Sequence, residues 1–189
     1  IEQCKEIVRT FNGIYGEILK EPEALLSNND VCKRLPGIDG KAKMSKSLGN
    51  CIYLSDDSDT VKQKVMSMYT DPNHLKVEDP GNVEDNAVFT YLDAFATDEY
   101  FSKYMNEYKN LDELKEHYMR GGLGDVKIKK FLYQILEEIL TPIREKRAYY
   151  EEHLDLVYKM LQDGSKRARM VAIDTLNDVR NAIGVNYFD

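Results

Sequence analysis

The chain has 189 residues, a length that fits one or two domains and suffices to bury a core without disulfides or a structural metal. A hydrophobic fraction of 42% with 31% charged residues excludes collagen-like, wholly disordered and membrane-spanning chains. The net charge of −7 argues against a protein that coats nucleic acid without specificity.

The amino-terminal segment carries apolar residues at spacings of three and four positions, which form one stripe on a helix. They are Ile1, Cys4, Ile7, Val8 and Phe11. Residues 23–26 predict one more helical turn after Pro22. Because the chain opens without a methionine, we expect it to be a piece of a longer protein.

The segment from Leu35 to Asn50 has no apolar period, and it contains one proline and three glycines. This composition predicts a loop. The next four residues, 51–54, are too few for more than a strand fragment or an extended link.

The pattern from residue 58 onward is helical, and short polar side chains mark the helix starts. Asp57 or Ser58 is the predicted cap of one helix, and Asn86 is the predicted cap of the next. Asp98 heads a further helical segment, and a short helix is predicted around Leu111.

We predict three carboxy-terminal helices, over residues 125–141, 142–164 and 165–183. Thr141 and Pro142 set the first boundary, as a cap and a first helical position, and a Gly-Ser pair sets the second. A glycine follows the last helix. We expect that helix to turn its apolar residues inward, namely Ala168, Ala172, Leu176, Val179 and Ile183.

The three cysteines, Cys4, Cys32 and Cys51, are odd in number and widely spaced, without a Cys-x-x-Cys pair. This usage favours reduced thiols in a cytoplasmic protein, and it predicts no metal site.

The predicted loop is basic in an acidic neighbourhood, with Lys33, Arg34, Lys41, Lys43 and Lys46 against the single acid Asp39. Lysines on a glycine-rich loop repel one another until an anion binds. This pattern indicates a mobile lid for a polyphosphate. On charge alone, however, a solvated surface loop is the preferred interpretation. Asp39 is expected to hold the open loop by ordering its lysines.

Residues 43–47, Lys-Met-Ser-Lys-Ser, resemble the KMSKS loop of the class I aminoacyl-tRNA synthetases. The resemblance implies that the loop binds ATP, carried with Mg²⁺, through Lys43, Met44, Ser45, Lys46 and Ser47. It assigns catalysis to Lys46, which stabilises charge on the pyrophosphate as the amino acid carboxylate attacks the α-phosphorus. It makes Lys43 the second catalytic candidate. This role suits a displacement whose catalysis is mainly positioning and charge compensation.

Five further runs are similar, in unbroken order, to the carboxy-terminal part of the bacterial tryptophanyl-tRNA synthetases. They are residues 6–12, 65–72, 89–92, 122–127 and 142–147. The resemblance implies a ligase that activates tryptophan as an adenylate and transfers it to tRNA(Trp), and that is a homodimer when intact. A tyrosyl-type class I synthetase and a noncatalytic helical tRNA-binding module are the alternatives.

The resemblance also implies a fold that is mainly α. Residues 1–57 would end a Rossmann-type α/β catalytic domain that carries the KMSKS loop, and residues 58–189 would form a helical anticodon-binding bundle. The family's His-x-Gly-His motif is not formed by His74, His117 or His153. We therefore expect the fragment alone to be inactive.

A second basic cluster is the predicted tRNA contact, through Lys127, Lys130, Arg144 and Arg147. A solvated face of two packed helices is the alternative. The tyrosines at helical spacing are expected to pack in the core rather than stack on bases, and His74 is expected to be an ordinary loop histidine. These tyrosines are Tyr91, Tyr100, Tyr104 and Tyr108.

Overall fold

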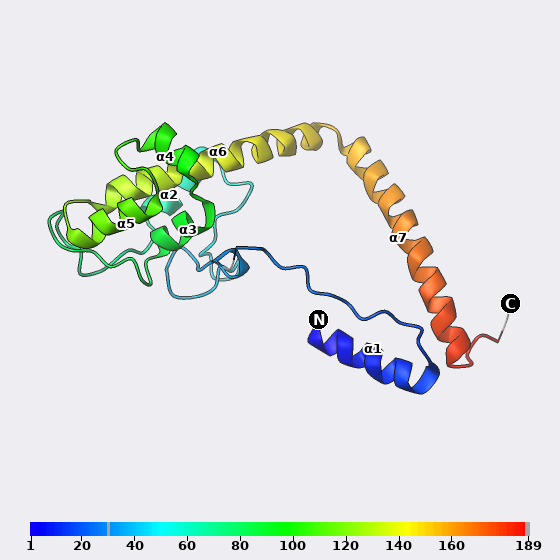
Figure 1. Ribbon diagram of the computed structural model, residues 1–189. Helices are drawn as coiled ribbons and strands as arrows, with labels where there is room; N and C mark the ends of the chain where they lie inside the picture. The colour runs from blue at the N-terminus through cyan, green and yellow to red at the C-terminus, as the bar shows by residue number, and fades with distance from the viewer. Residues whose placement is uncertain (30, 188–189) are drawn as a thin grey trace. The chain divides into compact units, whose positions relative to one another are not determined.

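The computed structural model describes residues 1–29 and 31–187, and within these ranges the chain is helical without a β-strand (Figure 1). The predicted mainly-α class is therefore confirmed. The chain divides into two compact units, one of residues 1–26 with 150–189 and the other of residues 27–149. No helix in the described part is long and apolar enough to cross a membrane.

Helix α1 spans Glu2–Tyr15, as the apolar spacing predicts. It ends at Gly16, whose φ of 98° is easily reached without a side chain. The side chain of Asn12 then holds the following turn, donating to the Leu19 carbonyl at 2.7 Å and accepting from the Leu19 amide at 3.0 Å. The extra helical turn predicted at residues 23–26 is wrong, because no helix is formed there. A single turn fixes several residues for one hydrogen bond and rarely forms unaided.

The segment after α1 contains one 3₁₀ turn, η1 (Val31–Lys33), followed by the predicted loop. Within this loop Pro36 and Lys43 form an isolated antiparallel bridge. Residues 51–54 have no strand partner, so they are the extended link rather than the strand fragment.

Four short helices surround the first half of a long one in the second unit (Figure 1). They are α2 (Ser58–Met66), α3 (Ala87–Phe95), α4 (Asp98–Tyr104) and α5 (Leu111–Arg120). Two caps are the predicted ones, since Asp57 accepts from the Thr60 amide and Asn86 accepts from the Val88 amide. These bonds satisfy amides that the first turn leaves unpaired.

The core of this unit is aromatic and aliphatic, and it includes two of the four tyrosines expected there. Tyr91 and Tyr108 are buried, whereas Tyr100 and Tyr104 are half-buried and stack on each other with ring centroids 6.4 Å apart. Both rings pack against the buried cluster. The other large side chains of the core are Phe89, Phe101, Tyr118 and Phe131.

Helix α6 spans Asp125–Glu152 and runs through Pro142, so the predicted stop at Thr141 is wrong. A proline inside a helix costs about 3 kcal/mol because it removes an amide donor and crowds the preceding turn. Here an ion pair crosses the proline, with Arg144 Nη2 2.7 Å from Glu137 Oε2. The Thr141 hydroxyl also donates to the Glu137 carbonyl at 2.7 Å. These contacts join the turns on both sides of the proline.

Helix α7 spans Leu154–Ala182 without the predicted break at its Gly-Ser pair. Glycine in a helix costs only about 1 kcal/mol relative to alanine, which the long flanking segments outweigh. Gly184 follows it as predicted, with φ of 69° and the Val185 amide bonded back to the Arg180 carbonyl at 3.0 Å. The expectation that its apolar residues point inward is wrong, because no residue of α7 is buried. Four residues of that stripe are exposed, and Val179 is half-buried.

Candidate functional site

Three hydrogen bonds fix the base of the basic loop, one within the loop and two to the helical unit. The Ile38 amide donates to the Asn50 carbonyl at 2.9 Å, which closes the loop on itself. The Tyr69 amide donates to the Ile38 carbonyl at 2.8 Å, and the buried Tyr91 hydroxyl donates to the Pro36 carbonyl at 2.8 Å. Burial raises the pKa of Tyr91, so its hydroxyl stays protonated and remains a donor.

The side chain of Asn50 organises the interior of the loop, a role that nothing in the sequence indicates except its place after the motif. Asn50 is 4% exposed, and its Oδ1 accepts from the Ser45 amide at 2.8 Å. Its Nδ2 donates to Asp39 Oδ1 at 3.2 Å and reaches the Lys43 carbonyl at 3.5 Å. One buried amide group thus sets the path of residues 43–45.

The five motif residues divide into anchors and exposed groups. The Met44 side chain packs against the core cluster, and the half-buried Ser45 hydroxyl lies 2.9 Å from that of Ser47. Lys43 and Lys46 are exposed. The loop therefore presents two ammonium groups on a backbone that is itself held in place.

Asp39 contributes to the loop in a different way from the one expected. Its Oδ1 accepts from Asn50 Nδ2 and, at 3.4 Å, from the Lys41 amide. Within the described residues it makes no ion pair with a lysine ammonium group. The acid therefore shapes the backbone of the loop.

A cavity of about 470 Å³ opens beside the motif. Met44, Ser45 and Lys46 line one part of it, and residues 51–55 line another. Arg147 of α6 completes the lining, so this predicted RNA-contact residue lies beside the motif. The cavity is within the range of small-molecule sites.

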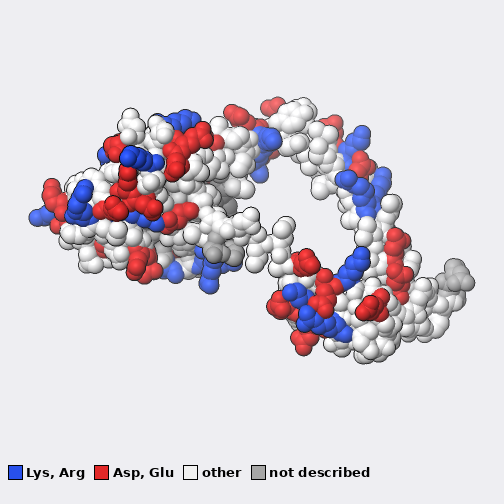
Figure 2. Space-filling model, viewed as in Figure 1, with Lys and Arg blue, Asp and Glu red and all other residues white. Residues whose placement is uncertain are grey.

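The predicted tRNA-contact residues do not form one patch. Lys127 and Lys130 line a second cavity near the start of α6, away from the one that Arg147 lines. The Arg144 guanidinium is engaged with Glu137 and with the Asp56 carbonyl. On the face shown in Figure 2, basic and acidic side chains are interspersed over the second unit rather than separated.

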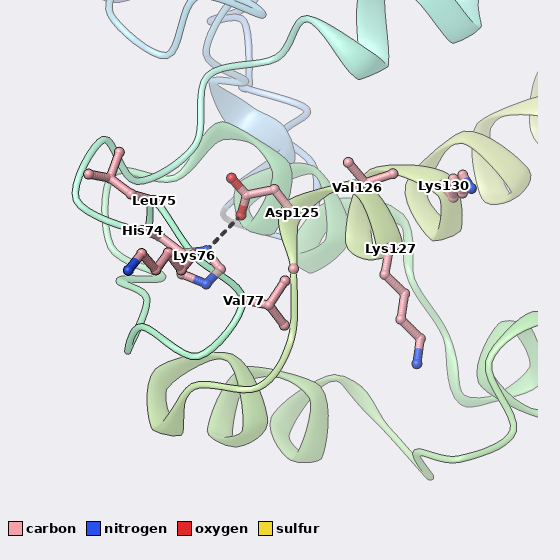
Figure 3. Close-up of a pocket in the computed structure, with 9 residues that line it drawn as sticks. His74, Leu75, Lys76, Val77, Asp125, Val126, Lys127 and Lys130 are labelled. Atoms are coloured by element: carbon pink, nitrogen blue, oxygen red, sulfur yellow. Dashed lines mark hydrogen bonds and ion pairs between the residues drawn. The ribbon is translucent and has the colours of Figure 1, made fainter.

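The second cavity is lined by His74, which is buried (Figure 3). The sequence predicts only an ordinary loop histidine at this position. His74 Nδ1 lies 3.1 Å from Asp125 Oδ1 and 3.1 Å from the Tyr118 hydroxyl. Tyr118 and Thr70 also donate to the Asp125 carboxylate, at 2.8 and 2.7 Å. Burial opposes ionisation of Asp125, but the hydrogen bonds from Thr70, Tyr118 and His74 outweigh it and lower its pKa.

The sequence profile of the family described as tRNA synthetases class I (W and Y) matches residues 1–141. The chain belongs to this family. The predicted resemblance is thereby confirmed, and it covers both the loop and the helices that support it.

Relatives of this family match the chain over its whole length. The tryptophan–tRNA ligase of Streptococcus pyogenes serotype M3 is 57% identical over 189 residues, which are 100% of this chain and 54% of the relative. That of Clostridium longisporum is 56% identical over 190 residues, which are 53% of its length. The chain thus spans about half the length of the curated relatives it matches.

Solved structures of the family have the same fold over nearly all of the chain. The tryptophanyl-tRNA synthetase of Campylobacter jejuni, complexed with ADP and tryptophan, matches with a TM-score of 0.68 and 27% identity. The match covers 95% of this chain and 52% of that one. The enzyme of Mycoplasma pneumoniae matches with a TM-score of 0.70 at 20% identity, over 95% and 53% of the two chains, which shows the fold alone.

Proposed function

We propose that the chain is the carboxy-terminal part of a tryptophan–tRNA ligase, which joins tryptophan to tRNA(Trp) through an ATP-derived adenylate. In this proposal residues 1–57 end the Rossmann-type catalytic domain, and residues 58–189 form the helical domain that contacts the anticodon. The observation that carries it is the 57% identity to a tryptophan–tRNA ligase over the whole chain. The loop geometry supports the same activity, since both motif lysines are exposed on a fixed base.

The proposed chemistry is charge compensation by the loop. As the tryptophan carboxylate attacks the α-phosphorus of ATP, the bond to the bridging oxygen breaks and negative charge grows on the pyrophosphate. Lys46 and Lys43 meet that charge as movable point charges, and Ser45 and Ser47 supply hydroxyl donors. Met44 contributes to ATP binding indirectly in this proposal. Its side chain packs on the core cluster and thereby anchors the loop.

The Mg²⁺ in this proposal arrives with ATP. Within the described residues no three His, Cys, Asp or Glu side chains are grouped so that they would hold a metal ion. Mg²⁺ commonly keeps several waters and binds substrate phosphates rather than an all-protein cage. In this proposal the residues of this chain contact the phosphates, and Mg²⁺ bound with ATP would neutralise part of the phosphate charge.

The chain alone is proposed to be inactive, because the histidine motif expected for the other half of the nucleotide site is not formed by its three histidines. The intact ligase would supply that half, would bind tryptophan there and would act as a homodimer in the cytoplasm.

The tRNA backbone is proposed to contact Lys127, Lys130 and Arg147. Arg144 is the weakest of the four predicted contacts, since its ion pair with Glu137 crosses the helix proline and both side chains are only 20% exposed. Its removal would disturb α6 before it tested RNA binding.

The test is a chimera in which the amino-terminal half of the Streptococcus pyogenes relative precedes Ile1. Tryptophan-dependent exchange of pyrophosphate into ATP is expected, with none for tyrosine and none for the 189 residues alone. Exchange that depends on tyrosine would overturn the specificity.

The rival function, a noncatalytic tRNA-binding module, is tested in parallel by filter binding of tRNA(Trp) to the 189 residues with and without ATP. It would be favoured by a chimera that binds tRNA(Trp) but supports no exchange with either amino acid. A chimera that supports no exchange and does not bind tRNA(Trp) would overturn both functions.

A further inference from the structure

Residues 51–57 connect the KMSKS loop to α2, and we call them the loop–α2 link. Residues 51–55 of the link line the cavity beside the motif, together with Met44, Ser45 and Lys46. The link belongs to no sheet in the described chain, so individual contacts set its path. Because the link and Lys46 line the same cavity, the position of the link determines the space that the Lys46 side chain has on that side.

Asp56 holds the carboxy-terminal end of the link through both its side chain and its carbonyl. Its Oδ2 accepts from the Tyr53 amide at 2.8 Å and pairs with Lys64 Nζ of α2 at 2.5 Å. Its carbonyl accepts from Arg144 Nη1 of α6 at 3.3 Å. The link is therefore fixed to α2 by an ion pair and to α6 by a hydrogen bond to its backbone.

The Arg144 guanidinium is itself held in one orientation. Nη1 and Nη2 donate to the two carboxylate oxygens of Glu137 at 3.1 and 2.7 Å. Nη2 also donates to the Thr141 hydroxyl at 3.0 Å, and the Arg144 side chain is only 20% exposed. A planar fork bound in this way by one carboxylate has little freedom, so α6 sets the place of the N–H that meets the link.

The same turn of α6 reaches the cavity. Arg147 lies three positions after Arg144, on a neighbouring part of the helix surface, and it lines the cavity with Lys46. The contact between Arg144 and the Asp56 carbonyl is therefore made beside the motif.

We propose that Arg144 is a positioning residue for adenylate formation, an assignment that rests on the proposed function. It holds the loop–α2 link, and the link in turn keeps the Lys46 ammonium group where it can meet the pyrophosphate. Arg144 touches neither ATP nor the reacting atoms. A small displacement of a charge that acts at the transition state lowers the rate strongly, so a residue that fixes the link affects the reaction from outside the site.

Two variants separate this role from the stabilisation of α6. Arg144→Ala and Glu137→Ala both remove the ion pair that crosses the helix proline, but only Arg144→Ala removes the bond to the Asp56 carbonyl. The readout is amide hydrogen exchange of Tyr53 by NMR in the 189-residue chain, since this amide is bonded to Asp56.

The Tyr53 exchange rate is expected to rise about tenfold in Arg144→Ala, because loss of a hydrogen bond from a charged donor raises the open population by about that factor. In Glu137→Ala it should rise less than about twofold, since the Asp56 carbonyl keeps its donor. The matched control is Lys146→Ala, which removes an exposed cation from the same turn of α6 and should leave the rate unchanged.

The effect on catalysis is measured in the chimera by a double-mutant cycle with Lys46→Ala. Arg144→Ala alone is expected to lower kcat for tryptophan-dependent pyrophosphate exchange about tenfold and to leave the KM for tryptophan unchanged. In the Lys46→Ala background it should lower kcat less than about twofold further, because the ammonium group that the link positions is already absent. Lys146→Ala should change neither constant.

Two results would overturn the assignment. Equal Tyr53 rates in Arg144→Ala and Glu137→Ala would show that Arg144 only stabilises α6. Additive losses of kcat in the cycle would show that Arg144 acts independently of Lys46. A wild-type chimera without exchange would instead refute the proposed function and any catalytic consequence of Arg144 with it, whereas the Tyr53 rates would still decide whether Arg144 holds the link.

Discussion

Replacing Asn50 with alanine should release the KMSKS loop without unfolding the helical unit. The amide group makes two well-formed hydrogen bonds, to the Ser45 amide at 2.8 Å and to Asp39 at 3.2 Å, and a weaker one to the Lys43 carbonyl at 3.5 Å. Each hydrogen bond contributes about 0.5–1.5 kcal/mol net, so the loss is roughly 2 kcal/mol.

That loss should appear as local opening of the loop rather than as global destabilisation, because the side-chain hydrogen bonds of Asn50 are all made to residues of the loop. A change of roughly 2 kcal/mol corresponds to about a 30-fold increase in the open population. The assay is amide hydrogen exchange of Ser45 by NMR, where the exchange rate should rise by about that factor. Amides of α6 should exchange as before.

The matched control is Asn73→Ala, an exposed asparagine whose side chain makes no hydrogen bond in the described part of the chain. It should leave the Ser45 rate unchanged. Asn50→Asp keeps the acceptor for the Ser45 amide but places a second carboxylate against Asp39. Ser45 should therefore be protected less at pH 7 than at pH 3 in this variant. An unchanged Ser45 rate in Asn50→Ala would refute the view that this side chain fixes the loop.

Three further outcomes are expected. Gly37→Ala should disturb the same loop, since a Cβ there would clash with the side-chain amide of Asn50, and the Ser45 exchange rate should again report it. The pKa of Asp125 is lower in the folded chain than its ordinary value of 3.8, so ionised Asp125 stabilises the fold at pH values above 3.8. This contribution to stability is lost as the pH falls through the folded-state pKa. The urea midpoint should therefore drop more between pH 5 and pH 2 for wild type than for Asp125→Asn, and equal drops would contradict this. In the chimera, Lys46→Ala should lower kcat for adenylate formation more than it raises the KM for ATP, whereas equal changes would remove Lys46 from the mechanism.

Local patterns predicted most of the helices, because capping and apolar spacing act over a few residues. Asp57 and Asn86 cap the helices where short polar side chains precede an apolar period. Gly184 follows the last helix, where a residue with positive φ is needed. The family is likewise readable from a short contiguous motif, residues 43–47, confirmed by the family match over residues 1–141.

One of the wrongly predicted helix boundaries is the Thr-Pro pair, and contacts across the proline accompany the continuing helix. Thr141 and Pro142 are a good helix start, but Arg144 and Glu137 pair across them and the helix continues. The sequence does not predict that Arg144 and Glu137 form an ion pair, since isolated charges on a helix are usually solvated.

Long-range packing decided which residues build the two sites. His74 and Asp125 are 51 positions apart, and only the folded unit turns a loop histidine into a buried, oriented one. Asn50 reads as a flank of the motif until the loop closes and its amide meets the Ser45 backbone. The residue types and the motif are local and are written in the sequence. The pairing of distant polar groups depends on how the chain closes on itself, and only the tertiary structure determines it.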